Sequence, residues 1–404
     1  MPFQLSSLQA EFLLSERGSE WLNKAADLPL TPATQLNDLQ TLRRKLSQAE
    51  ASAVVEQVLL RRRGEQKFTK SAAMLFTRNA LEQATHRLVA RHRAGRFAEM
   101  DLTADLGCGI GGDAIRLAPV AGRVIGFDVD ALRLAFARHN AGVYGLDRQV
   151  DFIQADALRP PVNLKRIDAF FADPARRAPD GKRTFDPQQY SPPLDALLEV
   201  YGRYPLGIKV APGLDYATFS VGEVEVVSLS GEVKETVLWF NDLATPGVTR
   251  RATLLPEGVL LTDAAPDDCS VGELDDYLYE PDPAVIRAGL VKQVGAQLGL
   301  GLLDKNIAYL SGSTVLQSPF VKGYQIEARL SLKVKQINRY LKSRHISRVN
   351  IKQRGTGLKP EAVLSRLKPA KEGVERTLIL LRMQDRHLAL VCRRMTNYER
   401  RTTN

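Results

Sequence analysis

The stretch TADLGCGIGGDAIRLA, residues 103–118, passes from a short apolar run through a glycine-rich loop into a helical pattern. Gly107, Gly109, Gly111 and Gly112 allow sharp turns and let the backbone approach a ligand where a Cβ atom would clash. This order of strand, glycine loop and helix is typical of α/β domains that bind a cofactor at the carboxyl edge of a parallel sheet. The spacing also fits G-x-G-x-x-G, so a dinucleotide oxidoreductase is a competing interpretation of the loop.

Downstream of the loop, short apolar runs alternate with helical segments. The runs lie at residues 123–129, 150–156, 167–174 and 206–213. They are continuous rather than alternating in polarity, which is expected for strands covered by helices on both faces. The rhythm predicts a parallel, doubly wound α/β sheet. Two more runs, 223–229 and 235–242, are joined so closely that they predict a hairpin, and the sheet then ends with an antiparallel strand.

We expect the chain to divide into four parts. Residues 1–95 show helical spacing, including one helix predicted for residues 80–94, and residues 96–245 hold the wound sheet. Residues 246–330 begin as a linker rich in Pro, Gly and Asp and continue as a small α+β module. Residues 331–404 form a further, basic α+β domain.

The composition is that of a globular chain with more than one domain. Of its 404 residues, 44% are hydrophobic and 25% charged, and no apolar run has the length that spans a bilayer. The N-terminus lacks the pattern of a signal peptide. The cysteines, Cys108, Cys269 and Cys392, are far apart, and they form no metal-ligand pattern with the five scattered histidines. We therefore expect a cytoplasmic protein with no membrane segment and no metal.

The positive charge of the chain is concentrated at its end. Residues 333–404 hold 19 Lys and Arg against 5 Asp and Glu, a net charge of +14, whereas the remainder carries −4. A solvated basic face is one interpretation of this asymmetry. Contact with a nucleic acid is the interpretation that we favour, because clustered cations neutralise backbone phosphates.

Four aspartates follow successive strands of the predicted sheet: Asp105, Asp128, Asp156 and Asp173. An acid at the second position can hold both ribose hydroxyls, in nicotinamide sites as well as in others. The first would repel a pyrophosphate at the helix N-terminus, where negative charge is otherwise favoured. It suits instead a ligand with an ammonium and a sulfonium group. The full series is therefore unexpected in a dehydrogenase.

These segments resemble the cofactor site of the class I S-adenosylmethionine-dependent methyltransferases. DLGCGIGG is similar to their first motif, FDVD to the second, QADA to the third and ADPA to the fourth. The resemblance implies a Rossmann-like fold, S-adenosylmethionine as cofactor and a role in binding it for seven residues: Asp105, Gly107, Gly109 and Gly111 at the methionine part, Asp128 at the ribose, and Asp156 with Ala157 at the adenine. Cys108 lies in the same loop and is interpreted as a small packing residue.

The pair Asp173-Pro174 follows the fourth predicted strand. Methylation of an exocyclic amine requires that its N–H groups be held so that the lone pair points at the methyl group, and an aspartate oxygen with a neighbouring carbonyl can do this. The loop resembles the Asp-Pro-Pro-aromatic motif of amino-methylating nucleic-acid enzymes, but Ala175 replaces the second proline and Arg176 the aromatic residue. We predict catalytic roles for Asp173, Pro174 and Arg176. Guanine N2 or another amine then stays open as the target.

Further residues are candidates for the same cleft. Arg177 on the loop, and Lys209, Pro212 and Asp215 after the fifth strand, are predicted to contact substrate or to brace the loop. In the helical part, Lys67, Thr77 and Gln83 are candidates to cover the cofactor, with helix capping as the alternative for such residues.

The segment KSRHISRVNIKQRGTGLKPEAVLSRLKP, residues 342–369, resembles the THUMP-like domain attached to a group of bacterial methyltransferases. In that group a ferredoxin-like module precedes this domain. The resemblance implies RNA, either tRNA or rRNA, as the partner, and the predicted contacts are Arg339, Lys342, Arg344, Lys352, Arg354 and Lys359. A methyltransferase acting on a small molecule or a protein, and a non-catalytic RNA-binding protein, are the alternatives. The oligomeric state stays open.

Overall fold

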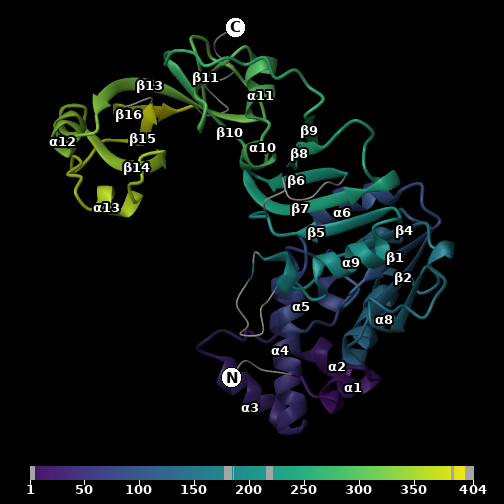
Figure 1. Cartoon of the computed structure of the whole chain (residues 1–404). Helices are drawn as coiled ribbons and strands as arrows, with labels where there is room; N and C mark the ends of the chain where they lie inside the picture. The colour runs from purple at the N-terminus through teal and green to yellow at the C-terminus, as the bar shows by residue number, and fades with distance from the viewer. Residues whose placement is uncertain (1–4, 177–183, 185, 215–221, 384–385, 396–404) are drawn as a thin grey trace. The chain divides into compact units, whose positions relative to one another are not determined.

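The structure, a computed structural model, describes residues 5–176, 184, 186–214, 222–383 and 386–395. The chain folds into two compact units (Figure 1). The first consists of Met1–Glu223 with Lys234–Thr245, and the second of Val224–Val233 with Pro246–Asn404. The division into four parts made from the sequence remains a proposal.

The first unit begins with helices, as the sequence predicts. They are α1 (Ser7–Leu14), α2 (Glu16–Ala25), α3 (Gln35–Arg43) and α4 (Gln48–Gly64). Ser6 and Ser47 each start a helix with a capping box, in which the serine hydroxyl accepts from the backbone N–H three residues on. The apolar faces of these helices pack into one core with Phe171 of the sheet and with Phe136 of the helix Ala131–Tyr144. The helical part and the sheet therefore stabilise each other.

The helix predicted for residues 80–94 is two helices, and the prediction is wrong at this point. The first, α5 (Arg78–Gln83), is capped by Thr77, whose hydroxyl accepts from the Ala80 N–H at 3.3 Å. The chain leaves the helix at Ala84, and His86 caps α6 (Arg87–Ala94) by accepting from the Leu88 N–H. The break places Gln83, Ala84 and Thr85 along the functional cavity.

The sheet of the first unit has the predicted wound arrangement. Its strands are β1 (Leu102–Leu106), β2 (Arg123–Asp128), β3 (Val150–Gln154), β4 (Ala169–Ala172), β5 (Leu206–Val210) and β7 (Glu232–Phe240), in the spatial order β3-β2-β1-β4-β5-β7. Pairing is parallel from β3 to β5, and β7 runs antiparallel to β5. The chain order reverses between β1 and β4, which is where wound sheets bind their ligands.

Helices follow the strands and fix the loops at this edge of the sheet. They are α7 (Ala114–Leu117), α8 (Ala131–Tyr144) and α9 (Leu194–Tyr201). Asn140 of α8 is fully buried, and its amide nitrogen donates to the carbonyls of Leu75 and Ile110. Its oxygen accepts from the Leu75 N–H at 2.8 Å. One side chain thus ties the helical part to the glycine loop.

In the second unit, part of the predicted linker is sheet. Strands β6 (Glu223–Leu229), β8 (Arg250–Leu255) and β9 (Val259–Thr262) pair in that order, β6 with β8 in parallel and β8 with β9 antiparallel. Residues 250–262 are therefore not a linker. Pro256 and Gly258, which suggested an irregular segment, form the turn between β8 and β9, and Gly258 has a φ of +71°.

The rest of the second unit is built on one seven-stranded sheet. Its strands are β10 (Tyr277–Pro281), β11 (Gly301–Asp304), β12 (Ile307–Gly312), β13 (Val321–Ser331), β14 (Ile346–Arg354), β15 (Val374–Met383) and β16 (Arg386–Arg394), in the order β11-β12-β10-β13-β16-β15-β14. The small module and the basic domain share this sheet through β13, which pairs with β10 on one side and with β16 on the other.

Helices complete both halves of this sheet. They are α10 (Pro283–Ala288), α11 (Val291–Leu298), α12 (Val334–Ser343) and α13 (Pro360–Leu364). In the basic half, Ile337 and Leu341 of α12 and Val363 of α13 pack with apolar residues of β15 and β16. With helix α12, strand β14 and the antiparallel pair β15–β16, this part has the α+β composition that the sequence predicts.

Candidate active site

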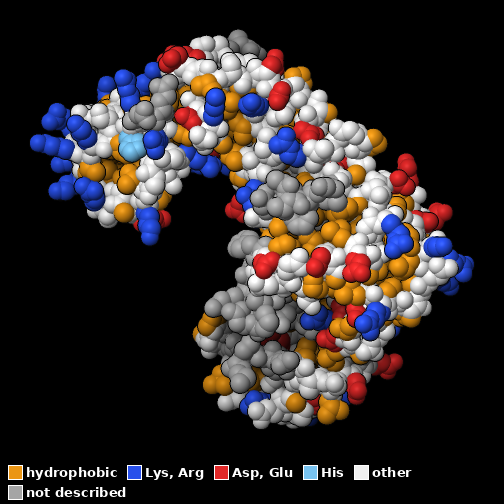
Figure 2. Space-filling model, viewed as in Figure 1, with side chains coloured by type: hydrophobic (Ala, Val, Ile, Leu, Met, Phe, Trp, Pro, Cys, Tyr) orange, Lys and Arg blue, Asp and Glu red, His pale blue; other side chains and the backbone are white. Residues whose placement is uncertain are grey.

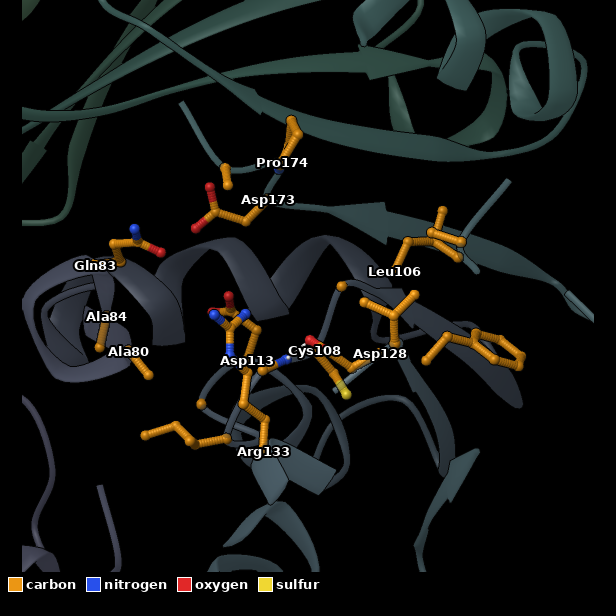
Figure 3. A pocket seen from close by; sticks show the side chains of 18 of the residues that line it. Ala80, Gln83, Ala84, Leu106, Cys108, Asp113, Asp128, Arg133, Asp173 and Pro174 are labelled. Atoms are coloured by element: carbon orange, nitrogen blue, oxygen red, sulfur yellow. Dashed lines mark hydrogen bonds between the residues drawn. The ribbon is translucent and has the colours of Figure 1, made fainter. Parts of the chain in front are cut away.

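A cavity of about 390 Å³ opens at the carboxyl ends of the strands of the first unit, beside the pair β1 and β4 at which the chain order reverses. Its walls come from the loops after β1 to β4 and from the α5–α6 break (Figure 3). Asp173 and Pro174 lie on one side of the space, and Asp113, Cys108 and Asp128 lie on another. Elements far apart in sequence thus supply one site.

The glycine loop leaves room for a ligand at two positions. Gly107 and Gly109 have φ angles of +77° and +55°, and a Cβ atom at either would meet nothing within 4 Å. Both line the cavity. Gly111 does not: a Cβ there would come within 3.3 Å of Ala137 on α8. Gly111 instead allows the loop to pack closely on α8. We therefore assign it this packing role in place of the predicted contact with the cofactor.

Asp128 and its neighbour form the second wall. The Asp128 carboxylate is 6% exposed and accepts from the N–H groups of Gly109 and Asp130, both at 2.9 Å. A carboxylate has further lone pairs, so it still has capacity for hydroxyl donors. Val129 beside it lines the cavity with an apolar side chain that is 66% exposed. A flat apolar ring fits this surface.

Asp156 and Ala157 follow β3 and also line the cavity, as predicted. The Asp156 carboxylate is exposed and accepts from the Leu158 N–H at 2.9 Å. Ala157 is buried, and its carbonyl accepts from the Tyr201 hydroxyl of α9. Burial raises the pKa of Tyr201, so that hydroxyl keeps its proton and holds the loop.

Asp105 does not line the cavity, and its predicted contact with the cofactor is corrected. Successive side chains of a strand point to opposite faces, and Leu106 takes the cavity side. Asp105 is 2% exposed, and its Oδ2 has no hydrogen-bond partner among the described residues. Burial and the nearby Asp113 raise its pKa well above the usual range. The carboxylate on the cavity wall at this end is that of Asp113, which the sequence analysis missed.

Arg93 of α6 was also missed. Its side chain is 2% exposed and forms ion pairs with Asp113 and with Glu235 of β7. The guanidinium carbon lies 4.3 Å from the centre of the Phe171 ring. Burial opposes the charge of Arg93, but the neighbouring carboxylates outweigh it and raise the pKa of the guanidinium. The signal in the sequence was an arginine at helical spacing from Val89, on the buried face of α6.

A smaller hollow of about 110 Å³ shares Asp173, Pro174 and Gln83 with the main cavity. Arg176 and Lys209 line it as well. The loop that carries Asp173 is fixed because Ala175 and Ser191 exchange two backbone hydrogen bonds of 3.0 Å. Arg176 donates to the Val210 carbonyl at 3.3 Å, which holds its guanidinium at the hollow.

Other predicted substrate residues differ in their placement. Pro212 is half-buried in a turn and lines neither cavity. Arg177 and Asp215 lie outside the described residues. Lys67 donates to the carbonyls of Leu81 and Glu82, at 2.7 and 3.0 Å, and so braces the end of α5 rather than lining the cavity.

Cys108 is 7% exposed, and burial raises the pKa of its thiol well above the usual range. It is therefore a packing residue, because a nucleophile would have to be a thiolate. Within the described part of the chain, no group of His, Cys, Asp and Glu side chains could hold a metal ion. Over the same residues, no helix combines the length and apolarity that crossing a membrane requires.

The basic residues of the second unit fall into two groups. Arg339 and Lys342 on α12, Arg344 at its C-terminal cap and Lys359 before α13 are exposed. Figure 2 shows Lys and Arg side chains gathered over this part of the unit. Lys352 and Arg354 of β14 differ, because both form ion pairs with Glu280, at 2.6 and 3.7 Å. Their role as RNA contacts stays a prediction, since the single carboxylate of Glu280 offsets only one of the two positive charges.

Family models match three segments of the chain. The model for RNA cap guanine-N2 methyltransferases matches residues 100–193, which run from the start of β1 to the loop beyond Asp173. A THUMP domain-like model matches residues 321–394, from β13 to β16. A model for a domain of unknown function matches residues 8–64.

Two curated relatives match more than three quarters of the chain. Two proteins from Mycobacterium tuberculosis, of strains CDC 1551 and H37Rv, are described as uncharacterized S-adenosylmethionine-dependent methyltransferases. Each is 38% identical to this chain over 325 residues, which are 78% of this chain and 88% of the relative. This chain belongs to the S-adenosylmethionine-dependent methyltransferases. The dehydrogenase interpretation of the glycine loop is thereby excluded.

The fold of the methyltransferase has a solved counterpart. A crystal structure of a protein from Porphyromonas gingivalis W83, assigned as a methyltransferase, superposes with a TM-score of 0.74 at 22% identity, over 97% of this chain and 100% of that one. The predicted fold class, a Rossmann-like class I sheet followed by a THUMP-like domain, is confirmed. The enzyme uses S-adenosylmethionine as its cofactor.

Proposed function

We propose that this methyltransferase modifies an exocyclic amine of a base in tRNA or rRNA. The observation that carries the proposal is the position of Asp173 and Pro174, which form the wall shared by the large cavity and the adjacent hollow. Gln83 and Ala175 also border both spaces, so a group in the hollow lies next to a group in the cavity along this wall. Residues that hold an amine at that point control the direction of its lone pair.

The residues of the larger cavity fit the cofactor. Gly107 and Gly109 provide open backbone for the methionine part, and Asp113 places a carboxylate where an ammonium group needs one. Asp128 accepts from the ribose hydroxyls, and Val129 packs against the adenine ring. Asp156 and the loop at Ala157 complete the adenine end. All these assignments concern residues on one continuous cavity wall.

The residues of the smaller hollow suit an amine. S-Adenosylmethionine supplies a methyl group that leaves its sulfur without the bonding electron pair. An exocyclic amine needs orientation more than a strong base, because its lone pair is delocalised into the ring. The Asp173 carboxylate and the Pro174 carbonyl accept its N–H hydrogen bonds and so direct that lone pair toward the cavity. Arg176 supplies a planar cation that stacks on a base or pairs with a phosphate.

Two further observations support RNA as the substrate. The segment that holds the cofactor motifs matches enzymes that methylate guanine N2 of the RNA cap, which makes guanine N2 the foremost candidate atom. The C-terminal half matches a THUMP domain-like model and exposes cations on α12 and before α13. Such cations bind a phosphate backbone without reading its sequence.

The test is a comparison of RNA nucleosides by mass spectrometry, from cells with and without the gene. One methylated nucleoside is expected to disappear from tRNA or rRNA and to return when the purified enzyme and cofactor are added to the deficient RNA. Asp173→Ala is the control that should not restore it. If the RNA nucleosides are unchanged and methyl transfer to a protein or a small molecule is found instead, the proposal of an RNA substrate is wrong. We also propose a cytoplasmic location, consistent with three free cysteines.

A further inference from the structure

Lys209 of β5 is buried beside the proposed substrate wall. The residue is 4% exposed, although lysines are seldom buried without a specific partner. Its ammonium donates to Asp173 Oδ2 at 2.6 Å and to the Thr85 hydroxyl at 3.0 Å. Thr85 lies in the break between α5 and α6, and Asp173 follows β4. Three separate elements therefore meet at this one ammonium group.

These contacts leave the two oxygens of Asp173 in different states. Oδ2 is occupied by Lys209, whereas Oδ1 has no hydrogen-bond partner among the described residues. The Asp173 side chain is 23% exposed and lines the hollow, whereas the Lys209 side chain is 6% exposed. Both residues line the hollow, but Asp173 is the more accessible of the two to a substrate, through its one unbonded oxygen.

The geometry points to Lys209 as a positioning residue, and this inference rests on the proposed function of Asp173. Lys209 holds the Asp173 carboxylate in the rotamer that presents Oδ1 to the amine, and Thr85 orients Lys209. Charge-assisted hydrogen bonds of this length are strong and directional. Without the hydrogen bond from Lys209, the Asp173 carboxylate rotates, and the amine N–H group that it accepts from moves with it. Misplacement by about 1 Å costs on the order of 10²-fold in rate.

The step that this hydrogen bond serves is an ordinary substitution at carbon. The amine lone pair forms the N–CH₃ bond, the S–CH₃ bond breaks, and its electron pair remains on sulfur as a neutral thioether. The nitrogen then releases one proton, which Asp173 Oδ1 accepts and passes to water. Lys209 exchanges no proton in this sequence, because its hydrogen bond to Oδ2 is present before and after transfer.

Kinetics separate positioning from direct binding of substrate. Extracts of cells that lack the gene are divided into RNA, protein and small molecules. The fraction to which the wild-type enzyme transfers methyl groups is then the substrate for every variant. For Lys209→Met we expect kcat to fall about 10²-fold, with KM and the Kd for S-adenosylmethionine changed less than about threefold. Lys209→Arg should recover part of the loss. Thr85→Val should lower kcat by about tenfold, and Thr85→Ser should not.

The matched control is Lys165→Met, an exposed lysine of the same unit that lines neither cavity. A rise in KM at unchanged kcat would show that Lys209 binds substrate directly and would overturn the inference. Equal loss of cofactor affinity would show a general structural role and would overturn it as well. If labelled methyl groups from S-adenosylmethionine are found only in protein or in small molecules, RNA is rejected as the substrate. The comparison of kcat between the variants still tests Lys209 in that case.

A crystal structure of the full-length Lys209→Met variant gives a result that needs no acceptor. We expect the Asp173 carboxylate to leave its original rotamer, with the backbone of residues 172–176 unchanged. The inference is wrong if the carboxylate keeps its orientation without the ammonium.

Discussion

Charge is used in opposite ways in the two units of this methyltransferase. In the first, Arg93 and Lys209 are buried and paired with carboxylates around the cofactor cavity. In the second, the cations of α12 are exposed. A buried charge that loses its partner is costly and insensitive to salt, whereas an exposed one contributes little by itself and is screened. Interior charges therefore determine chemistry and stability, and exterior charges determine salt-dependent affinity.

The largest effect on methyl transfer is expected for Asp173, which pairs with the buried Lys209 and lines the smaller hollow. Asp173→Ala should lower the rate of methyl transfer about 10²- to 10³-fold, because it removes a preorganised acceptor and leaves Lys209 without its anion. Single-turnover transfer measures this, and isothermal titration should show S-adenosylmethionine affinity within a few-fold. Transfer at the original rate would mean that Asp173 only ends the strand.

Arg93 should dominate stability rather than the transfer step. Arg93→Met leaves the buried Glu235 and the half-buried Asp113 without their cation, and the loss of a buried partner costs about 3–5 kcal/mol of unfolding free energy. Urea denaturation measures this cost. Arg123→Met is the matched control, because the Arg123–Asp151 pair is exposed and its loss should cost less than about 1 kcal/mol. Similar losses in the two variants would contradict the contrast between buried and exposed charge.

Asp105 should make the stability of the cofactor-free enzyme depend on pH. Burial, reinforced by Asp113, raises its pKa above the ordinary value of 3.8, so the folded state keeps a proton that the unfolded chain has released. Its contribution to unfolding free energy therefore falls as pH rises from about 4 toward the raised pKa of the folded state. Asp105→Asn removes this pH dependence, so the unfolding free energy of the variant relative to the wild type should increase between pH 5 and pH 8.

Urea denaturation of both proteins across this pH range measures the difference. A constant difference between wild type and Asp105→Asn would show that Asp105 ionises normally in the fold.

The sequence predicted the edge of the sheet better than its interior. Asp128, Asp156 and Asp173 follow parallel strands, whose carboxyl ends must converge, so a common cavity followed from strand order alone. Asp105 precedes the end of its strand, and the pleat turns it to the opposite face from Leu106. A difference of one position along the strand therefore decides whether a side chain faces the cavity, as that of Leu106 does, or the opposite face, as that of Asp105 does.

Partners from distant segments could not be predicted. Arg93 meets Glu235, which lies 142 residues away, and Lys352 meets Glu280, 72 residues away. Such pairs depend on how a helix docks on a sheet or on which strands become neighbours, and neither is encoded in local periodicity. The break at Ala84 is similar, because His86 caps a new helix within a continuous helical pattern.

The smallest effect per residue is expected on the exposed side of the comparison. Replacing Arg339, Lys342 and Arg344 together by Gln should weaken RNA binding and lower the slope of log K against log salt by up to about three phosphate contacts. Filter binding of tRNA and rRNA between 50 and 200 mM salt measures that slope. Lys352→Gln is the informative control: Glu280 pairs with this lysine at 2.6 Å, so the slope should change less than for an unpaired cation. A decrease for Lys352 as large as that for one α12 residue would show that RNA competes with Glu280, and would remove the distinction between paired and exposed cations.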